Sequence, residues 1–208
     1  MKNLRWLENR LKIIKISLWI FPILISVAVW AADQPNAKAN LKSEDAECDA
    51  RQIRLFHKLL NFKKLGIVFR NDIVGKSNIE KAAEELGIEI VSCYIKPEQI
   101  ASDKITECLQ TLVKASEAIC ITRTMLANRG NISEIVRIAN ENSIPTFLQE
   151  GSEDVRYGFL MGLSDNCGKL SGKTPKIAIN IRTAKIIRYD PPLEVLEMAD
   201  KIYPDIEK

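Results

Sequence analysis

The stretch KLGIVFRNDIVGKSNIEKAAEELGIEIVSCY, residues 64–94, decides the fold of this chain. It predicts a strand over 65–69, a helix over 77–86 and a second strand over 88–94. Both strands are short apolar runs, the helix carries its apolar residues at helical spacing, and Gly87 ends that helix. A strand, a helix and a strand in this order predict a right-handed crossover between two parallel strands.

The same alternation of short apolar runs and amphipathic helices continues to the C-terminus. It is typical of a parallel sheet that helices cover on both faces. We therefore predict an α/β fold with a single doubly wound, mainly parallel sheet. The other elements expected are a helix over 51–62, a helix over 104–114, a strand over 118–122, a helix over 131–140, strands over 144–148, 157–163 and 176–181, and a helix from Asp190-Pro191 through Ile202.

A hydrophobic leader helix is expected before this domain. Residues 1–15 are basic, and residues 16–32 (ISLWIFPILISVAVWAA) carry no charge. A basic segment, an apolar segment and a small-residue end are typical of a secretory signal peptide, so cleavage is expected after Ala31. The alternative is a retained membrane anchor through 16–32, since this run is at the lower limit for crossing a bilayer. Both interpretations make the rest periplasmic or exported: a linker over 32–50 and the α/β domain over 51–208.

Charge and histidine content exclude several classes of function. The formal net charge is +3, and residues 1–31 hold five basic residues against one acidic residue. The rest of the chain is therefore slightly acidic, which gives no support for nucleic-acid binding. The one histidine, His57, precedes the first expected strand, so a Ser-His-Asp triad lacks a base and a site with two imidazoles is excluded. We expect no catalysis, no metal and no cofactor.

Five cysteines are present, and no two of them form a Cys-x-x-Cys pair, so zinc and thioredoxin-like sites are not indicated. Cys93 and Cys120 lie in apolar strand patterns and Cys108 lies on the apolar side of a helix. We interpret these three as small buried hydrophobic residues. Cys48 lies in the linker and Cys167 in an expected loop, and their spacing leaves a disulfide between them open.

Ligands of such sheets bind beyond the carboxyl ends of the strands, so the loops after three of the expected strands hold the candidate site. Helix N-terminal amides and a serine hydroxyl can hold a ligand carboxylate there, and a glutamate can accept a ligand ammonium. Helix capping by Ser77 or Asn131, and a solvated acidic turn at Glu150, are the structural alternatives. The candidate ligand-binding residues are Arg70, Asn71, Ser77, Asn78, Thr122, Thr124, Glu150 and Gly151.

The segment Gly75-Lys76-Ser77 lies between a strand and a helix and suggests a phosphate-binding loop. The first glycine of that motif would fall at Arg70, whose side chain blocks the tight turn. An enzyme that uses this loop on a phosphorylated substrate is therefore the weakest hypothesis for this chain.

Five stretches of this sequence match a known family: LLNFKKLGIVFR (59–70), KAAEELGIEIVS (81–92), IVRIANENSIPTF (135–147), GFLMGLS (158–164) and INIRTAKIIRYDPPLEVLEMADKI (179–202). The last stretch is the most specific, with an asparagine followed by a basic Thr-Ala-Lys segment, a Pro-Pro pair and a final Ala-Asp helix. Over residues 52–203 the sequence thus resembles the periplasmic substrate-binding proteins of ABC uptake systems, the type I binding-protein family whose characterised members bind aromatic amino acids. The resemblance implies a solute-binding component without chemistry of its own, which works with an ABC permease.

Members of that family clamp a solute between two α/β lobes, whereas this chain leaves room only for the second lobe, since a lobe needs about 100 residues. The resemblance implies ligand contacts from an Asn-Ser pair, nearest to Ser77 and Asn78, and from a Glu-Gly pair matched by Glu150 and Gly151. The family's acidic residue near Thr124 is missing.

A solute such as an amino acid is therefore the first ligand hypothesis. The second hypothesis is a non-catalytic interaction module that docks through the former inter-lobe face, onto a protein that supplies the missing lobe or onto itself as a homodimer. Residues 176–202 normally pack on the missing lobe, so we expect this segment to fold back, dimerise or stay loose. Its apolar side chains Leu193, Leu196 and Ile202 then need cover.

Overall fold

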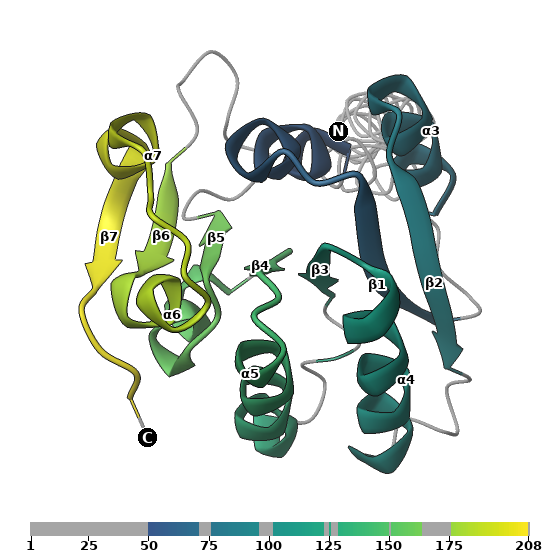
Figure 1. Ribbon diagram of the computed structural model, residues 1–208. Helices are drawn as coiled ribbons and strands as arrows, with labels where there is room; N and C mark the ends of the chain where they lie inside the picture. Colours follow the sequence, from purple (N-terminus) through teal and green to yellow (C-terminus); the bar gives the residue numbers. More distant parts are fainter. Residues whose placement is uncertain are drawn as a thin grey trace, which may run out of the picture. The chain divides into compact units, whose positions relative to one another are not determined.

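The computed structural model describes residues 50–70, 76–95, 102–122, 125, 129–149, 151–163 and 176–207 (Figure 1). All of them belong to the compact unit Lys42–Lys208. The expected leader and nearly all of the expected linker lie outside the described residues. Within the described part, no helix is long and apolar enough to cross a membrane.

A single sheet of seven strands organises the described residues, in the order β2-β1-β3-β4-β5-β6-β7. Neighbouring strands are parallel, except that β6 runs antiparallel to β5. This confirms the predicted single, mainly parallel sheet. The strands are β1 (Lys64–Arg70), β2 (Glu89–Ile95), β3 (Ala118–Ile121), β4 (Thr146–Leu148), β5 (Met161–Leu163), β6 (Ile177–Asn180) and β7 (Ala199–Tyr203).

Helices cover both faces of the sheet, as expected for a doubly wound fold (Figure 1). The helix over 50–60, α3, α6 and α7 pack on one face, and α4 and α5 pack on the other. The helical elements are α3 (Lys76–Leu86), α4 (Ser102–Ala115), α5 (Ile132–Glu141), α6 (Ile181–Ile186) and α7 (Leu193–Met198), with short 3-10 turns η2 (Arg129–Asn131) and η3 (Ser152–Tyr157).

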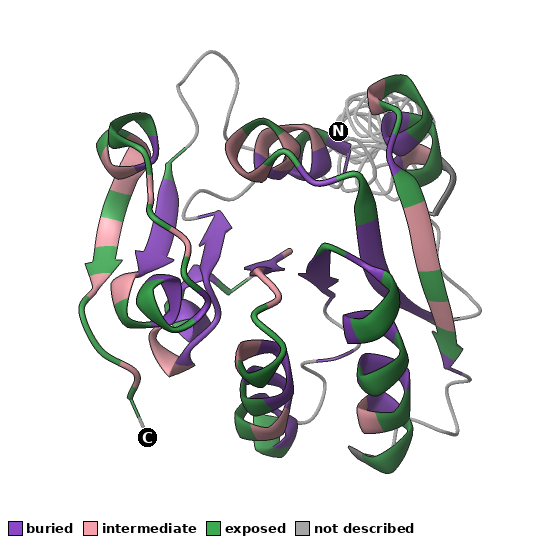
Figure 2. Ribbon diagram, in the orientation of Figure 1, coloured by how far each residue is buried: buried purple, intermediate pink, exposed green. Residues whose placement is uncertain are grey.

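The inner strands of the sheet are apolar on both sides because each side faces a buried core, whereas the edge strands β2 and β7 are partly exposed (Figure 2). The first core lies under the helix over 50–60, α3, α6 and α7, and the second lies under α4 and α5. In β1, Leu65 and Ile67 face the first core and Val68 faces the second. Phe147 of β4 is fully buried in the first core. Its ring stacks on that of Phe56 from the first helix, with ring centroids 4.1 Å apart. This aromatic contact fixes the first helix over the middle of the sheet.

Two expected elements differ from the structure. The apolar run over 157–163 is not one strand, because Gly158 turns the chain with φ 109° and β5 begins only at Met161. The helix expected through Ile202 ends at Met198, and residues 199–203 form β7 beside β6. The open edge of β6 provides backbone hydrogen bonds that a helix at this place would leave unmade. Helix α6 was not predicted.

The C-terminal segment folds back onto the sheet, which was one of the three expected outcomes. Val195 of α7 is buried against the first core. Leu193 remains 70% exposed and Ile202 remains 53% exposed, whereas Leu196 is half-buried. The segment therefore covers only part of its own apolar surface.

A disulfide joins Cys93 of β2 to Cys108 of α4, with the Cα atoms 5.7 Å apart. Cys108 is buried, as predicted, and Cys93 is only partly buried. The interpretation of the two residues as simple hydrophobic side chains was wrong because they form a disulfide, and an apolar sequence setting does not report the distance between a strand and the helix that packs on it. Cys120 is buried in β3, as predicted. Cys48 and Cys167, and with them the hypothesis of a disulfide between them, lie outside the described residues.

Candidate functional site

The predicted site lies at one edge of the sheet. Strands β1, β3 and β4 are parallel neighbours, so their carboxyl ends lie at the same end of the sheet. The chain passes from β1 outward to β2 and from β3 outward to β4, which makes the gap between β1 and β3 the point where the strand order reverses. Open α/β sheets bind their ligands at such a point.

Three of the candidate residues can be placed there with their surroundings. Thr122 follows β3 and is buried, and its hydroxyl donates to the Val68 carbonyl at 3.1 Å. The Thr122 hydroxyl thus links β3 to β1 and has a structural role. Gly151 is exposed and has a left-handed backbone (φ 78°), and its carbonyl accepts the Asp154 N–H at 2.7 Å. Asn78 is half-buried in the first turn of α3.

The other candidates are described only in part. Arg70 is the last residue of β1 and Ser77 is the second residue of α3, so the topology brings the backbones of both residues to the same end of the sheet. Their side chains lie outside what the structure describes, as do Asn71, Thr124 and Glu150. Of the phosphate-loop segment only the backbone of Lys76 and Ser77, in α3, is described.

A pocket of about 310 Å³ opens at the N-terminus of α5, beyond the loop that follows β3. The η2 turn and the first turn of α5 form one wall of this α5 pocket. The end of η3 and the C-terminal segment form the rest. The lining residues are Arg129, Gly130, Ile132, Ser133, Tyr157 and Glu207.

The cationic side of the α5 pocket is oriented by an ion pair. The guanidinium of Arg129 lies 3.8 Å from the carboxylate of Asp154 in η3. The Asp154 side chain is only 8% exposed, whereas that of Arg129 is 73% exposed. The largely exposed Arg129 side chain, which lines the pocket, thus pairs with a nearly buried carboxylate.

The opposite side is built from consecutive residues of η3 and the end of the chain. The Arg156 guanidinium lies over the Tyr157 ring, 4.8 Å from its centroid, and donates to the Tyr157 hydroxyl at 2.9 Å. This hydrogen bond raises the pKa of Arg156. Glu207 pairs with Arg156 at 3.5 Å, and its backbone N–H donates to the Arg156 carbonyl. These contacts hold Tyr157 and Glu207 beside the pocket.

The expected cap of α5 is not formed. Asn131 precedes the helix, but its backbone is already helical (φ −82°, ψ −14°), because the η2 turn runs directly into α5. A capping side chain needs an extended backbone at this position, and Asn131 makes no capping hydrogen bond. Its side-chain Nδ2 is buried without a hydrogen-bond acceptor.

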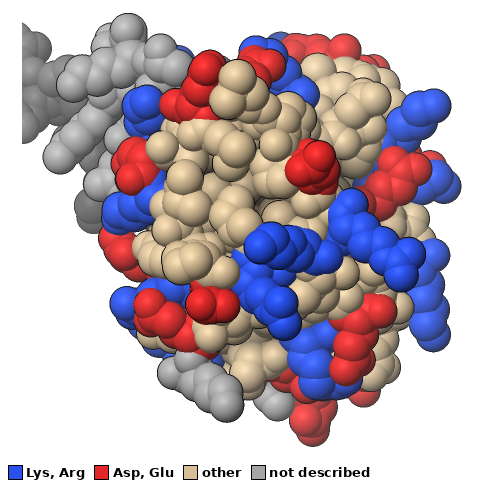
Figure 3. All heavy atoms as spheres, turned by 60° about the vertical axis from the view of Figure 1, so that its left-hand side comes forward, with Lys and Arg blue, Asp and Glu red and all other residues tan. Residues whose placement is uncertain are grey.

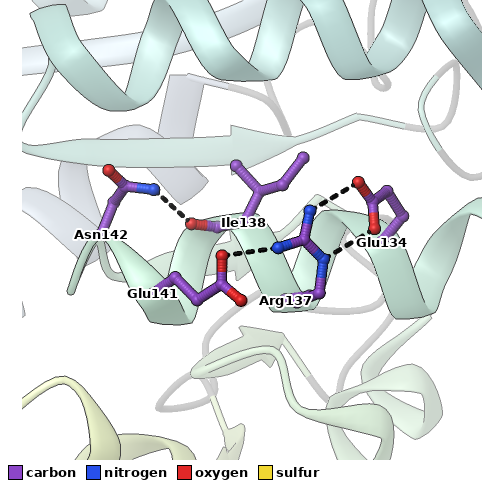
Figure 4. Close-up of polar contacts among 5 residues, drawn as sticks. All are labelled: Glu134, Arg137, Ile138, Glu141 and Asn142. Carbon is purple, nitrogen blue, oxygen red and sulfur yellow. Dashed lines mark hydrogen bonds and ion pairs between the residues drawn. The ribbon is translucent and has the colours of Figure 1, made fainter.

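Glu134, the third residue of α5, does not replace that cap. Both of its carboxylate oxygens accept hydrogen bonds from Arg137, at 2.8 and 2.9 Å, and Arg137 also donates to Glu141 (Figure 4). The bond from Arg137 lowers the pKa of Glu134. The carboxylate of Glu134 is thus paired with Arg137 on the outer surface of α5.

Sequence reasoning named none of the residues that line this pocket as candidates, although Arg129 and Gly130 lie in a loop that it singled out after the third expected strand. Arg129 carried a usable signal, since it is a basic residue directly before a helix start. Tyr157 was assigned to a strand, and Glu207 lies 50 residues further along the chain, so only the tertiary fold shows that they meet. Among the described residues, no cluster of His, Cys, Asp and Glu side chains has the arrangement of a metal site.

Comparison with known proteins yields no match to a family model and no match to a curated protein. Several solved structures share the fold, and three of them align with TM-scores of 0.57 to 0.60. A conserved domain protein from Vibrio cholerae aligns with a TM-score of 0.60 at 18% identity, over 74% of this chain and 60% of that protein. The fold is that of one lobe of a type I binding protein.

The other two structures are described by their function. CD0873 from Clostridium difficile, a substrate-binding protein with adhesive properties in its ligand-free, open form, aligns with a TM-score of 0.57 at 16% identity, over 74% of this chain and 59% of that one. An ABC domain from Streptococcus pneumonia in complex with L-Trp aligns with a TM-score of 0.58 at 17% identity, over 74% and 60%. This chain therefore spans about three fifths of the proteins that it resembles.

Proposed function

We propose that this chain binds a small solute, such as an amino acid, as one lobe of an ABC-type substrate-binding protein, and that it catalyses no reaction. The observation that carries the proposal is that the carboxyl ends of β1, β3 and β4 lie side by side at one end of the sheet, with the α5 pocket at the N-terminus of the helix that follows β3. The likeness to a substrate-binding protein and to an ABC domain in complex with L-Trp supports this function.

The proposal includes a location outside the cytoplasm. The leader pattern indicates export, and the Cys93–Cys108 disulfide is an independent argument, because disulfides persist mainly in oxidising compartments. The proposed partners are an ABC permease and a protein that supplies the second wall of the site. A single lobe contacts only one side of a solute, whereas small-molecule sites bury most of the ligand surface. We therefore expect weak binding by this chain alone.

Calorimetry and thermal unfolding test the proposal on the purified chain, with a panel of aromatic and branched-chain amino acids at millimolar concentrations. A solute that binds only the folded state raises the stability by about 2.7 kcal/mol at one hundred times its Kd. We expect at least one amino acid to give saturable heat and a concentration-dependent rise in Tm. A folded chain that shows neither effect with any member would refute solute binding.

A second candidate function is protein docking along the edge strand β7 of the sheet. β7 is an edge strand, and Ile202 of β7 and Leu193 of the preceding helix α7 remain exposed. Figure 3 brings this side of the domain forward and shows an extended uncharged surface between groups of charged side chains. Light scattering after size exclusion tests self-association. We expect Ile202→Lys to lower the mass of any dimer, and a wild-type monomer at high concentration would refute the homodimer.

A further inference from the structure

We propose that the Cys93–Cys108 disulfide is a site of thiol–disulfide exchange, at which a small-molecule thiol becomes attached to Cys93. This modification goes beyond the proposed function and does not depend on solute binding. The starting point is a second pocket, of about 320 Å³, formed by residues of β2 and α4. The lining of this disulfide pocket includes both cysteines together with Tyr94, Lys104, Glu107 and Thr111.

The first argument is access to the disulfide. Both cysteines line the pocket, and Cys93 is only partly buried, whereas Cys108 is 6% exposed. Three of the side chains around them, Tyr94, Lys104 and Glu107, are exposed. The rate of thiol–disulfide exchange depends on whether the attacking thiolate can reach a disulfide sulfur. A small thiol can therefore reach this disulfide while the domain stays folded.

The second argument is the position of the disulfide at the edge of the sheet. Among the described strands β2 is the outermost and pairs only with β1, and α4 packs beside it (Figure 1). Apart from Ile95, every residue of β2 is exposed or partly buried, whereas every residue of the inner strand β3 is buried. A thiol that approaches from this edge therefore does not require the inner strands to separate.

The attack is directed at Cys93 because it is the less buried of the two cysteines. The thiolate of the small molecule forms a new S–S bond with the Cys93 Sγ, the bond between Cys93 and Cys108 breaks, and its electron pair leaves on the Cys108 Sγ. The products are a mixed disulfide at Cys93 and a Cys108 thiolate, which takes up a proton. A second thiol can then attack the small-molecule sulfur of the mixed disulfide, which leaves both cysteines reduced and the two thiols oxidised to their own disulfide.

Lys104 is the residue that assists the departure of Cys108. It precedes Cys108 by four positions in α4, so the two side chains share one face of the helix, and both line the pocket. The Lys104 ammonium donates to Glu107 at 2.5 Å, but both side chains of this pair are largely exposed, and such pairs are weak in water. A positive charge beside a thiol favours the thiolate, and a stabilised thiolate leaves faster. Because Glu107 opposes this effect, we expect Lys104 to change the rate only a few-fold.

The test incubates the full, oxidised chain with 2-mercaptoethanol under native conditions, alkylates reduced cysteines and locates the attached thiol by peptide mass spectrometry. We expect a mixed disulfide at Cys93 together with an alkylated Cys108. The rate should lie within about a hundredfold of that of the unfolded chain and should not change in urea too dilute to unfold the domain. A reaction that required global unfolding would be slower by a factor of about a thousand or more and would accelerate steeply with urea. That behaviour, or attachment of the thiol at Cys108, would overturn the proposal.

A comparison of Lys104→Gln with Lys114→Gln tests the role of Lys104. Both variants remove one exposed lysine charge from α4, but Lys114 lies in the last turn of the helix and does not line the pocket. We expect Lys104→Gln to slow the exchange about threefold or more, and Lys104→Arg and Lys114→Gln to keep the wild-type rate. Urea unfolding should give the same stability for all three variants, which separates the effect from a general loss of structure. Equal rates in the two glutamine variants would refute the role of Lys104.

Discussion

Replacement of Cys93 and Cys108 by alanine should cost a large part of the stability of this domain. The two residues are separated by 15 positions, and their disulfide ties the edge strand β2 to α4. Removing a cross-link that closes a loop of this length increases the entropy of the unfolded chain, which lowers the free energy of unfolding by about 3 kcal/mol. Single domains are stable by only about 5–15 kcal/mol, so the effect is easily measured.

Urea unfolding with and without reductant isolates this contribution. Reductant should lower the free energy of unfolding of the wild type by about 3 kcal/mol. The double variant should be about as stable as the reduced wild type. Reductant should not lower the free energy of unfolding of this variant further. Cys108 is 6% exposed, so its replacement adds a small packing loss that reduction alone does not cause.

The reasoning would be refuted if the double variant were as stable as the oxidised wild type. It would also be refuted if alkylation of the unreduced, unfolded chain modified both Cys93 and Cys108. A response to reductant that persists in the double variant would instead reveal a further disulfide, as the hypothesis of a Cys48–Cys167 bond requires.

Three further predictions concern packing, backbone conformation and pH. Phe147→Ala should destabilise the domain by about 3–5 kcal/mol in urea unfolding, because the fully buried ring stacks within the first core; a loss below about 1 kcal/mol would contradict this. Gly158→Ala should be more destabilising than Gly87→Ala. Both glycines have positive φ, but a Cβ atom at position 158 would lie 2.7 Å from a valine methyl group, whereas a Cβ atom at position 87 would have no other heavy atom within 4 Å. Equal losses would count against this local packing. The pKa of Glu153 is lowered chiefly by its hydrogen bond from Lys201. The ionised Glu153 carboxylate therefore stabilises the fold fully above pH 4.5, and this stabilisation is lost as the pH falls through the lowered pKa. Carboxyl NMR titration should show a higher pKa of Glu153 in Lys201→Met, and an unchanged midpoint would show that the bond is absent in solution.

The placement of the candidate residues at the carboxyl ends of the strands could be predicted, because it follows from topology; that they bind a ligand stays a prediction. Arg70, Ser77, Thr122 and Gly151 were placed beyond strands that proved to be parallel neighbours. Their roles could not be predicted from the pattern. Thr122 is typical of this limit, since a threonine after a strand can contact a ligand or bond to the next strand, and here its hydroxyl bonds to Val68.

The sequence by itself determined the repeated order of strands and helices, since apolar periodicity is a local property of the chain. It also indicated the parallel sheet, because strands that are apolar on both sides must be covered on both faces. Only the tertiary structure decided that residues 199–203 become an edge strand, that Cys93 meets Cys108, and that Glu207 reaches the start of α5. These outcomes depend on pairings between residues far apart in the chain, and the free energy of packing the whole domain selects them.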